Sequence, residues 1–327
     1  MSKPTDVMAL GNIILDFLIE VDENKLLEMD LKKGEMHLVD EQQAHNILKK
    51  IEEHQLKIEL CPGGSAANTL RGLALLGATV ILCGKVGQDK HGQFYVEEIK
   101  KQKVQSKLSN HHLPTGKAIT FITPDSERTF SVHLGASLEL VKEDVLEEDI
   151  ARSKILHLEG YQLEGKTRDV VLHSIHLAKK HGTLVSLDLA DPGVIRRNRE
   201  HLLEILNKVD FLFLNEKEAL EFTGLEEQEA LLELGQYVPT VILKLGVKGS
   251  LILHEEVIHF IEPFPVKALD TTGAGDTYAA GFLYGFTNSW PIEKAGKLGS
   301  LFASKIVETK GVNFSEIDVE IIKKQVS

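Results

Sequence analysis

The chain has 327 residues, of which 43% are apolar, 6% aromatic and 26% charged, a balance typical of a soluble globular protein and not of a disordered or fibrous one. Its 37 basic and 49 acidic side chains leave a net charge of −12, so the overall field repels nucleic acids and anionic membranes, and a phosphate-bearing ligand needs a local site. Cys61 and Cys83 have neither disulfide-framework nor metal-site spacing, and no apolar run would span a bilayer. We therefore expect a cytoplasmic monomer or homodimer without nucleic-acid or membrane partners.

The N-terminal part of the chain contains strand signals followed by one amphipathic helix. Residues 7–15 form a short apolar run that predicts the first core strand, and residues 12–21 predict a further strand that continues past it. Residues 40–54 carry apolar side chains at positions i, i+3, i+4 and i+7 behind Asp40, a residue suited to an N-cap. A helix is therefore expected over residues 40–54.

A glycine-rich turn precedes the next predicted helix, in residues 62–77 with the sequence PGGSAANTLRGLALLG. Gly63 and Gly64 at a helix start, followed by Asn68, suit polyol recognition, because an asparagine amide offers both a donor and an acceptor to adjacent hydroxyl groups. Asn12 and Asp16 near the first strand add an amide and a carboxylate that could grip a sugar diol. Taken alone, the segment is an ordinary glycine turn before an apolar helix.

The middle of the chain alternates strands with helix-length segments. Two apolar runs, residues 118–123 and 129–134, are joined by the polar residues 124–128 and predict a hairpin. Further runs predict βαβ units and a largely parallel sheet, and these cover residues 154–158, 183–187, 210–214 and 241–245. We expect a single α/β domain over residues 1–327 with a small accessory sheet.

Residues 160–167 match the phosphate-binding pattern G-x-x-x-x-G-K-[ST], with Lys166 as its lysine, and follow a predicted strand. A phosphate cradle needs consecutive backbone amides close to the ligand. Tyr161, Leu163 and Glu164 instead place bulk and a negative charge there. A P-loop nucleotide-binding protein that uses Lys166 is therefore the distant alternative.

The segment most informative about chemistry is residues 270–285, with the sequence DTTGAGDTYAAGFLYG. Gly273, Ala274 and Gly275 allow close backbone approach and precede a small, apolar helix, whose bare N-terminal amides would bind a phosphate. Asp276 lies at the edge of this anion site. A carboxylate there repels phosphate, but it could accept the proton of a hydroxyl group that attacks the phosphate. The alternative explanation is an acid favoured by the helix dipole alone.

Residues 62–68 and 270–276 resemble the two signatures of the ribokinase-like (PfkB) carbohydrate and nucleoside kinase family, in the family's order and spacing. The similarity covers essentially the whole chain, and residues 11–16 and 33–40 are more similar to the adenosine-kinase-like branch than to ribokinase itself. The resemblance implies a three-layer α/β sandwich with a mostly parallel central sheet. It also implies a small β lid, contributed by two stretches near residues 12–40 and 104–136.

The resemblance implies ATP-dependent transfer of the γ-phosphoryl group to a primary hydroxyl. Asp276 would be the base, and the amides of Gly273, Ala274 and Gly275 would stabilise the charge that develops on the phosphate. For the lid, Phe130 is the candidate substrate contact, with Phe17 and Leu134 as further apolar surfaces. These three side chains would otherwise form the lid's own small core.

Several residues match the family's cofactor positions. Asn215 and Glu218 correspond to the element that holds hydrated Mg²⁺, and Gly246 and Gly249 to the glycine turn beside ATP. Lys244 stands where many relatives have a threonine, and its ammonium could serve the same phosphate. The positions that match a monovalent cation site, partly through backbone carbonyls and with K⁺ as the ion, are Asp270, Thr272, Gly311 and Ser315.

We therefore expect a kinase that uses Mg-ATP on a small-molecule nucleoside, with adenosine as the first candidate. The alternative within the class is a kinase for ribose, fructose or a keto-sugar acid. A kinase-like binding protein without catalysis fits less well, because a binder has no use for a base at position 276.

Overall fold

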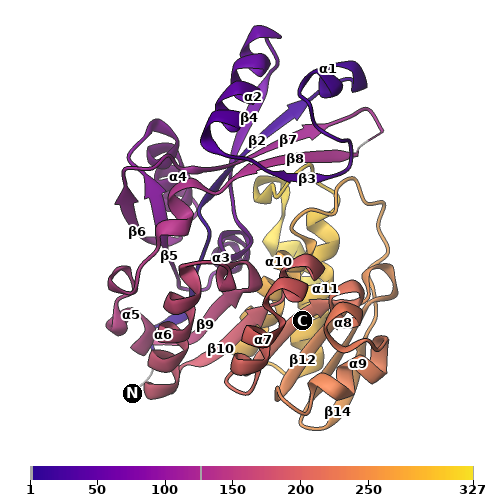
Figure 1. Ribbon diagram of the computed structural model, residues 1–327. Coiled ribbons are helices and arrows are strands. Elements are labelled where there is room, and N and C mark those ends of the chain that lie inside the picture. Colours follow the sequence, from indigo (N-terminus) through magenta and orange to yellow (C-terminus); the bar gives the residue numbers. More distant parts are fainter. Residues whose placement is uncertain (1–2, 126, 327) are drawn as a thin grey trace.

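The computed structural model describes residues 3–125 and 127–326, which form a large and a small sheet with helices around them (Figure 1). The large sheet has the strand order β14-β13-β12-β11-β10-β9-β1-β5-β6. Its strands from β12 to β6 are parallel, and β13 and β14 continue it antiparallel at one edge. The strands are β1 (Thr5–Leu10), β5 (Val80–Gly87), β6 (Gln105–His111), β9 (Ser153–Glu159), β10 (Leu184–Asp188), β11 (Phe211–Asn215), β12 (Thr240–Lys244), β13 (Ser250–His254) and β14 (Val257–Ile261).

Successive side chains of a strand point to opposite faces of the sheet. Both faces of the large sheet are apolar, and helices cover each of them. In β1, Val7 and Ala9 join one apolar core, and Met8 and Leu10 join the other. The first core includes α3 (Ser65–Leu76), α4 (Lys90–Lys101), α10 (Ala274–Thr287), α11 (Ile292–Ile306) and α12 (Val319–Val326). The second includes α5 (Glu147–Ala151), α6 (Thr167–Lys180), α7 (Pro192–Leu206), α8 (Glu216–Thr223) and α9 (Glu227–Leu234). The chain thus adopts the ribokinase-like three-layer α/β sandwich.

The small sheet lies beyond one end of the large sheet, with α1 (Glu23–Glu28) and α2 (Glu41–Glu53) beside it (Figure 1). Its order is β3-β8-β7-β2-β4. The strands are β2 (Ile14–Glu20), β3 (Met36–Leu38), β4 (Ile58–Gly63), β7 (Gly116–Ile122) and β8 (Arg128–His133). The predicted lid ranges therefore need correction: β6 belongs to the large sheet, and β4 belongs to the small one. Local sequence identifies a strand, but the partner strand decides which sheet it joins.

The local predictions agree well with the structure. The helix expected over residues 40–54 is α2, which Asp40 caps by accepting a hydrogen bond from the Gln43 amide. The expected hairpin is the antiparallel pair β7 and β8, whose connecting turn includes Ser126, outside the described residues. Within residues 3–125 and 127–326, no helix is both long and apolar enough to cross a membrane.

Candidate active site

The parallel strands bring polar side chains to one edge of the large sheet. Glu159, Asp188, Asn215 and Lys244 are the last residues of β9, β10, β11 and β12, respectively. In the strand register, Glu159 pairs with Asp188 and Asn215 pairs with Lys244. In a parallel α/β sheet, ligands bind outside the carboxyl ends of the strands, so this edge is where a site is expected.

The start of α10 lies beside this edge and meets the glycine turn before α3. Gly273 precedes α10 with a positive φ of 74°, and no side chain caps the helix. The Ala274 amide donates to the Thr271 carbonyl oxygen at 3.2 Å, so an anion would depend on the neighbouring amides of this helix start. The carboxylate of Asp276, in the first turn of α10, accepts hydrogen bonds from Ser65 Oγ at 2.7 Å and Asn68 Nδ2 at 3.0 Å. The two sequence motifs therefore meet at Asp276.

The environment of Asp276 suits a general base. Burial raises the pKa of Asp276 to about 6, while the hydrogen bonds from Asn68 and Ser65 oppose this rise. A base with a pKa near the working pH is ionised at neutrality and still has appreciable affinity for a proton. A solvated acid that only favours a helix N-terminus would not be held by two side chains from another helix.

The predicted substrate residues fall into two groups. Asp16 and Asn68 face the cavity beside Asp276, and burial raises the pKa of Asp16 to about 7, against the opposing charges of Arg71 and Arg128. Gly63 and Gly64 make room for their neighbours, and Gly64 also lines the cavity. A Cβ on Gly63 would lie 2.4 Å from the Asp16 carboxylate oxygens, and one on Gly64 would lie 2.3 Å from the backbone carbonyl oxygen of Asn12. Asn12 is buried and supports the turn through this close approach.

The cavity at Asp276 has a volume of about 200 Å³ and a lining of mixed chemistry. Carboxylates, an amide and hydroxyls line it together with apolar side chains from the small sheet and from the loop after α11. The apolar lining residues are Leu18, Ala118, Phe130 and Val312. Phe17 is instead buried, with its ring edge on His91 at a centroid distance of 5.2 Å, so it belongs to the core and not to the cavity.

Lys244 lies between the carboxylates of the sheet edge and the start of α10. Its Nζ atom is 2.8 Å from Asp188 Oδ2, and a Cβ on Gly275 would lie only 3.0 Å from Nζ. Burial disfavours the ammonium, but Asp188 and Glu218 outweigh this effect and raise the pKa of Lys244. A positive charge is therefore held beside the helix start, where a threonine hydroxyl would carry none.

The residues expected to hold Mg²⁺ fit a hydrated ion. Asn215 caps α8, and its side chain and backbone amide both bind the carboxylate of Glu218, which is 2% exposed. Burial, followed by the charge of Asp188, raises the pKa of Glu218 to about 7. Among the described residues, no three His, Cys, Asp or Glu side chains are grouped to hold a metal. Mg²⁺ commonly keeps several waters, and both Glu218 oxygens already accept hydrogen bonds from Asn215, so these residues would hold the ion through its waters.

The glycine turn after β12 has a structural explanation. Gly249 has φ of 99°, and a Cβ there would lie 2.2 Å from the carbonyl oxygen of Ile261. Gly246 also has a positive φ, but no atom lies within 4 Å of the place of its Cβ. Gly246 therefore leaves open space, as close approach to a nucleotide requires, whereas Gly249 is needed for packing.

The residues expected at a monovalent cation are only partly brought together. The Asp270 carboxylate accepts hydrogen bonds from the amides of Thr272 and Gly311 and from the guanidinium of Arg128. Ser315 is exposed and donates its hydroxyl to Asn313 Oδ1. The side-chain oxygens of Asp270 are thus occupied, so K⁺ at this loop would depend on backbone carbonyl oxygens.

Several site residues were missed by sequence reasoning. Ser65 lies inside the recognised glycine motif and carried a usable signal. Asp188 was recognised at the productive end of a predicted strand, but the sequence left its role open. Glu159 is also a strand end, and burial, then the charge of Asp276, raises its pKa well above the ordinary value. Arg128, which binds Asp270 and Thr272, had no local signal, because its partners are more than 140 residues away in the sequence.

The P-loop alternative is not supported by the geometry. Lys166 is 75% exposed in its side chain and lies 3.2 Å from a carboxylate oxygen of Glu139. The preceding residues, Gly160–Leu163, form a 3₁₀ turn, and Glu164 pairs with Arg197. The pattern therefore encodes a surface loop before α6.

Comparison with known proteins gives a consistent result. The family model described as pfkB family carbohydrate kinase matches residues 31–318. A 5-dehydro-2-deoxygluconokinase of Clostridium perfringens is 30% identical over 281 residues, covering 80% of this chain and 82% of the relative. A crystal structure of adenosine kinase from Sinorhizobium meliloti has a TM-score of 0.89 and 31% identity, over 99% of this chain and 100% of that one. A probable sugar kinase from Rhizobium etli has a TM-score of 0.90 and 29% identity, over 99% of each chain.

Proposed function

Because the chain belongs to the pfkB family of carbohydrate kinases, we propose that it transfers the γ-phosphoryl group of ATP to the primary hydroxyl of a nucleoside, with adenosine as the first candidate. The observation that carries this proposal is the cavity at Asp276, whose lining combines polar side chains that suit the hydroxyls of a ribose with apolar side chains that suit a base. Its volume of about 200 Å³ is below the roughly 300–1,000 Å³ of typical ligand pockets, so the acceptor must be a small molecule.

The proposed reaction uses groups from three elements. Asp276 accepts the proton of the attacking hydroxyl. Hydrogen bonds from Ser65 and Asn68 orient its carboxylate. The first amides of α10 and the ammonium of Lys244 stabilise the charge on the transferred phosphoryl group. Bound Mg²⁺, held through Asn215 and Glu218, would neutralise charge on the phosphates of ATP.

The choice between a nucleoside and a sugar acid depends on Arg128. Among the described residues that line the cavity, Arg128 is the one cation that could pair with a substrate carboxylate. However, its guanidinium binds Asp270 and Thr272, so its charge is already balanced. A neutral substrate with an apolar ring therefore fits this arrangement better. A keto-sugar acid is the second candidate, because several relatives are named 5-dehydro-2-deoxygluconokinase and because Arg128 lines the cavity.

An ADP-release assay over a panel of acceptors tests the proposal. The panel contains adenosine, inosine, ribose, fructose and 5-dehydro-2-deoxygluconate, each with Mg-ATP and with a no-acceptor control. We expect the highest kcat/KM for adenosine. Turnover of the sugar acid without turnover of adenosine would establish the second candidate, and ADP release that is independent of any acceptor would contradict phosphotransfer to a hydroxyl.

A further inference from the structure

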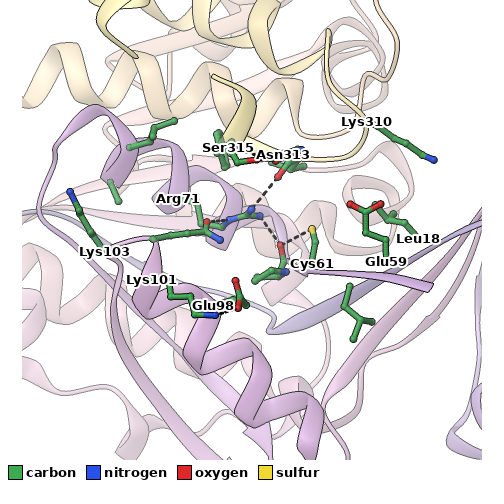
Figure 2. A pocket seen from close by; sticks show the side chains of 17 residues that line it. Leu18, Glu59, Cys61, Arg71, Glu98, Lys101, Lys103, Lys310, Asn313 and Ser315 are labelled. Atoms are coloured by element: carbon green, nitrogen blue, oxygen red, sulfur yellow. Dashed lines mark hydrogen bonds and ion pairs between the residues drawn. The ribbon is translucent and has the colours of Figure 1, made fainter. Parts of the chain in front are cut away.

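A second, larger cavity lies on the other side of β4 from the candidate active site. It has a volume of about 590 Å³ and is lined by residues of β4, α3, the end of α4 and the loop 310–315 (Figure 2). Leu18, Cys61 and Val312 line both cavities, so they form the wall between them. Of the site residues predicted from the sequence, only Ser315 is among the residues that line this cavity.

The floor of this cavity contains a buried cation without an acidic partner. Arg71 is 4% exposed, and Figure 2 shows it at the centre of the lining residues. Its guanidinium donates to neutral oxygens only, those of Gln102 Oε1 and Asn68 Oδ1 and the carbonyls of Pro62 and Val312. Among the described residues, no carboxylate forms an ion pair with Arg71. Burial raises the pKa of Asp16 and the charge of Arg71 opposes this rise, but the two side chains form no ion pair, so an anionic ligand would give Arg71 a direct partner.

The rest of the lining adds to the positive charge. Lys101, Lys103 and Lys310 also line the cavity, against the acids Glu59 and Glu98. Lys101 pairs with Glu98, and Lys310 pairs with Glu20 outside the cavity, whereas Lys103 forms no ion pair with any residue that the structure describes. The lining therefore carries four cations and two acids, in a protein whose net charge is −12. Such a local reversal of sign concentrates small anions from solution.

We infer that this cavity binds a small phosphate-bearing molecule, with its phosphate near Arg71 and Lys103. A guanidinium is well matched to phosphate oxygens, and one N–H of Arg71 remains after the four hydrogen bonds to protein. The volume exceeds that of a free phosphate, and Leu60, Leu75 and Phe314 provide an apolar wall for the remainder of the molecule. We therefore favour a phosphate ester of nucleotide size over inorganic phosphate.

The site is connected to the candidate catalytic residue by two hydrogen bonds. Arg71 Nη1 donates to Asn68 Oδ1 at 3.0 Å, and Asn68 Nδ2 donates to Asp276 Oδ2 at 3.0 Å. Arg71 thereby fixes which way the Asn68 amide faces and is a positioning residue for Asp276. An anion on Arg71 would thus lie next to a residue that orients the proposed base.

Calorimetric titration of the full-length protein tests the inference without any activity measurement. The active site, including its acceptor cavity, is first filled with saturating adenosine, a non-hydrolysable ATP analogue and Mg²⁺. Inorganic phosphate and AMP are then the probes. Lys103→Glu places a negative charge at the cavity, and Lys100→Glu is the matched control, because Lys100 is an exposed lysine three residues earlier, near the end of α4, but lines a different cavity.

We expect the wild type and Lys100→Glu to bind phosphate equally and Lys103→Glu to bind it at least about tenfold more weakly, with AMP tighter than phosphate. Phosphate as tight as AMP would identify the free anion as the occupant. Equal affinity in all three proteins, equal weakening in both variants, or no binding to the wild type would overturn the inference. If the ATP analogue fails to bind, the proposed function is in question, but the comparison of the two variants with phosphate still reports on this cavity.

Discussion

At the scale of single residues, burial of carboxyl groups distinguishes the candidate site from the rest of the acidic surface. Burial raises the pKa values of Asp16, Glu218 and Asp276 to between about 6 and 7, whereas the exposed Asp125 has a lowered pKa because Lys33 binds it. Asp16 and Asp276 line one cavity, and strongly perturbed carboxyl groups in a cavity are typical of sites that move protons.

The first prediction concerns the proposed base. Asp276→Asn keeps the shape of the side chain but removes its affinity for a proton, so kcat should fall by roughly 10²–10⁴ while ATP binding changes little. Steady-state kinetics and ATP-analogue titration measure the two effects. Asp169→Asn is the control, because Asp169 is an exposed acid in the same first-turn position of α6. Loss of turnover in Lys166→Ala with retained turnover in Asp276→Asn would favour the P-loop explanation instead.

The second prediction concerns pH. Asp276 must be ionised to accept a proton, and burial raises its pKa to about 6, so kcat should fall as the pH decreases through about 6. The pH dependence of folding stability has the opposite sign to that of kcat. The pKa is higher in the folded than in the unfolded state, so stability from this group is present at low pH and is lost as the pH rises through about 6.

Urea unfolding of the wild type and Asp276→Asn at pH 5 and pH 8 checks this sign. The variant should gain stability over the wild type at pH 8 and keep only part of that advantage at pH 5, which lies between the ordinary and the raised pKa of Asp276. An advantage that is larger at pH 5 would show that the carboxylate is not destabilised by burial.

At the scale of elements, two helix starts and one strand of the small sheet form the site. The turn between β4 and α3 brings Ser65 and Asn68 to the first turn of α10, and β8 brings Arg128 to the loop before α10. The turn depends on Gly64, whose φ is 92° and whose missing side chain lets the Asn12 carbonyl approach.

Gly64→Ala should therefore be harmful in two ways. A Cβ there would lie 2.3 Å from the Asn12 carbonyl oxygen, and the positive φ adds backbone strain of about 1 kcal/mol or more. Gly77→Ala is a matched control, because Gly77 has φ of 99° but no atom within 4 Å of the place of its Cβ. We expect Gly64→Ala to lose more stability to urea than Gly77→Ala and to raise KM for the acceptor, which Gly77→Ala should leave unchanged. Equal losses of stability in both variants would show that the close approach to Asn12 does not matter.

At the scale of the whole molecule, residues of both the small sheet and the large body line the site. Arg128 of the small sheet binds Asp270 and Thr272 of the loop before α10, and the cavity wall is shared between the sheets. A ligand in this cavity would contact both bodies and would bind the folded chain only.

Ligand binding should therefore stabilise the whole chain. At about 100 times its dissociation constant, a ligand adds about 2.7 kcal/mol to the free energy of unfolding. We expect adenosine with a non-hydrolysable ATP analogue and Mg²⁺ to raise the urea midpoint, and ribose at the same concentration to raise it less. A larger shift with ribose than with adenosine would contradict a nucleoside site.

Much of this protein is determined by its sequence alone. The period of the apolar residues predicts α2, the hairpin of β7 and β8 and the parallel strands, because each depends on neighbours in the chain. The two glycine motifs predict the family through their resemblance to its signatures. The second motif also predicts an anion site beside Asp276, because close backbone approach and a bare helix start require small residues.

Tertiary structure alone decided the rest. The assignment of β4 and β6 to different sheets depends on strand partners far away in the sequence, which no local pattern specifies. Folding likewise decides which polar side chains lie together. It pairs Arg128 with Asp270, Lys244 with Asp188 and Arg71 with Asn68. Sequence gives each side chain its chemistry, but burial and neighbours in space set its charge and its partner.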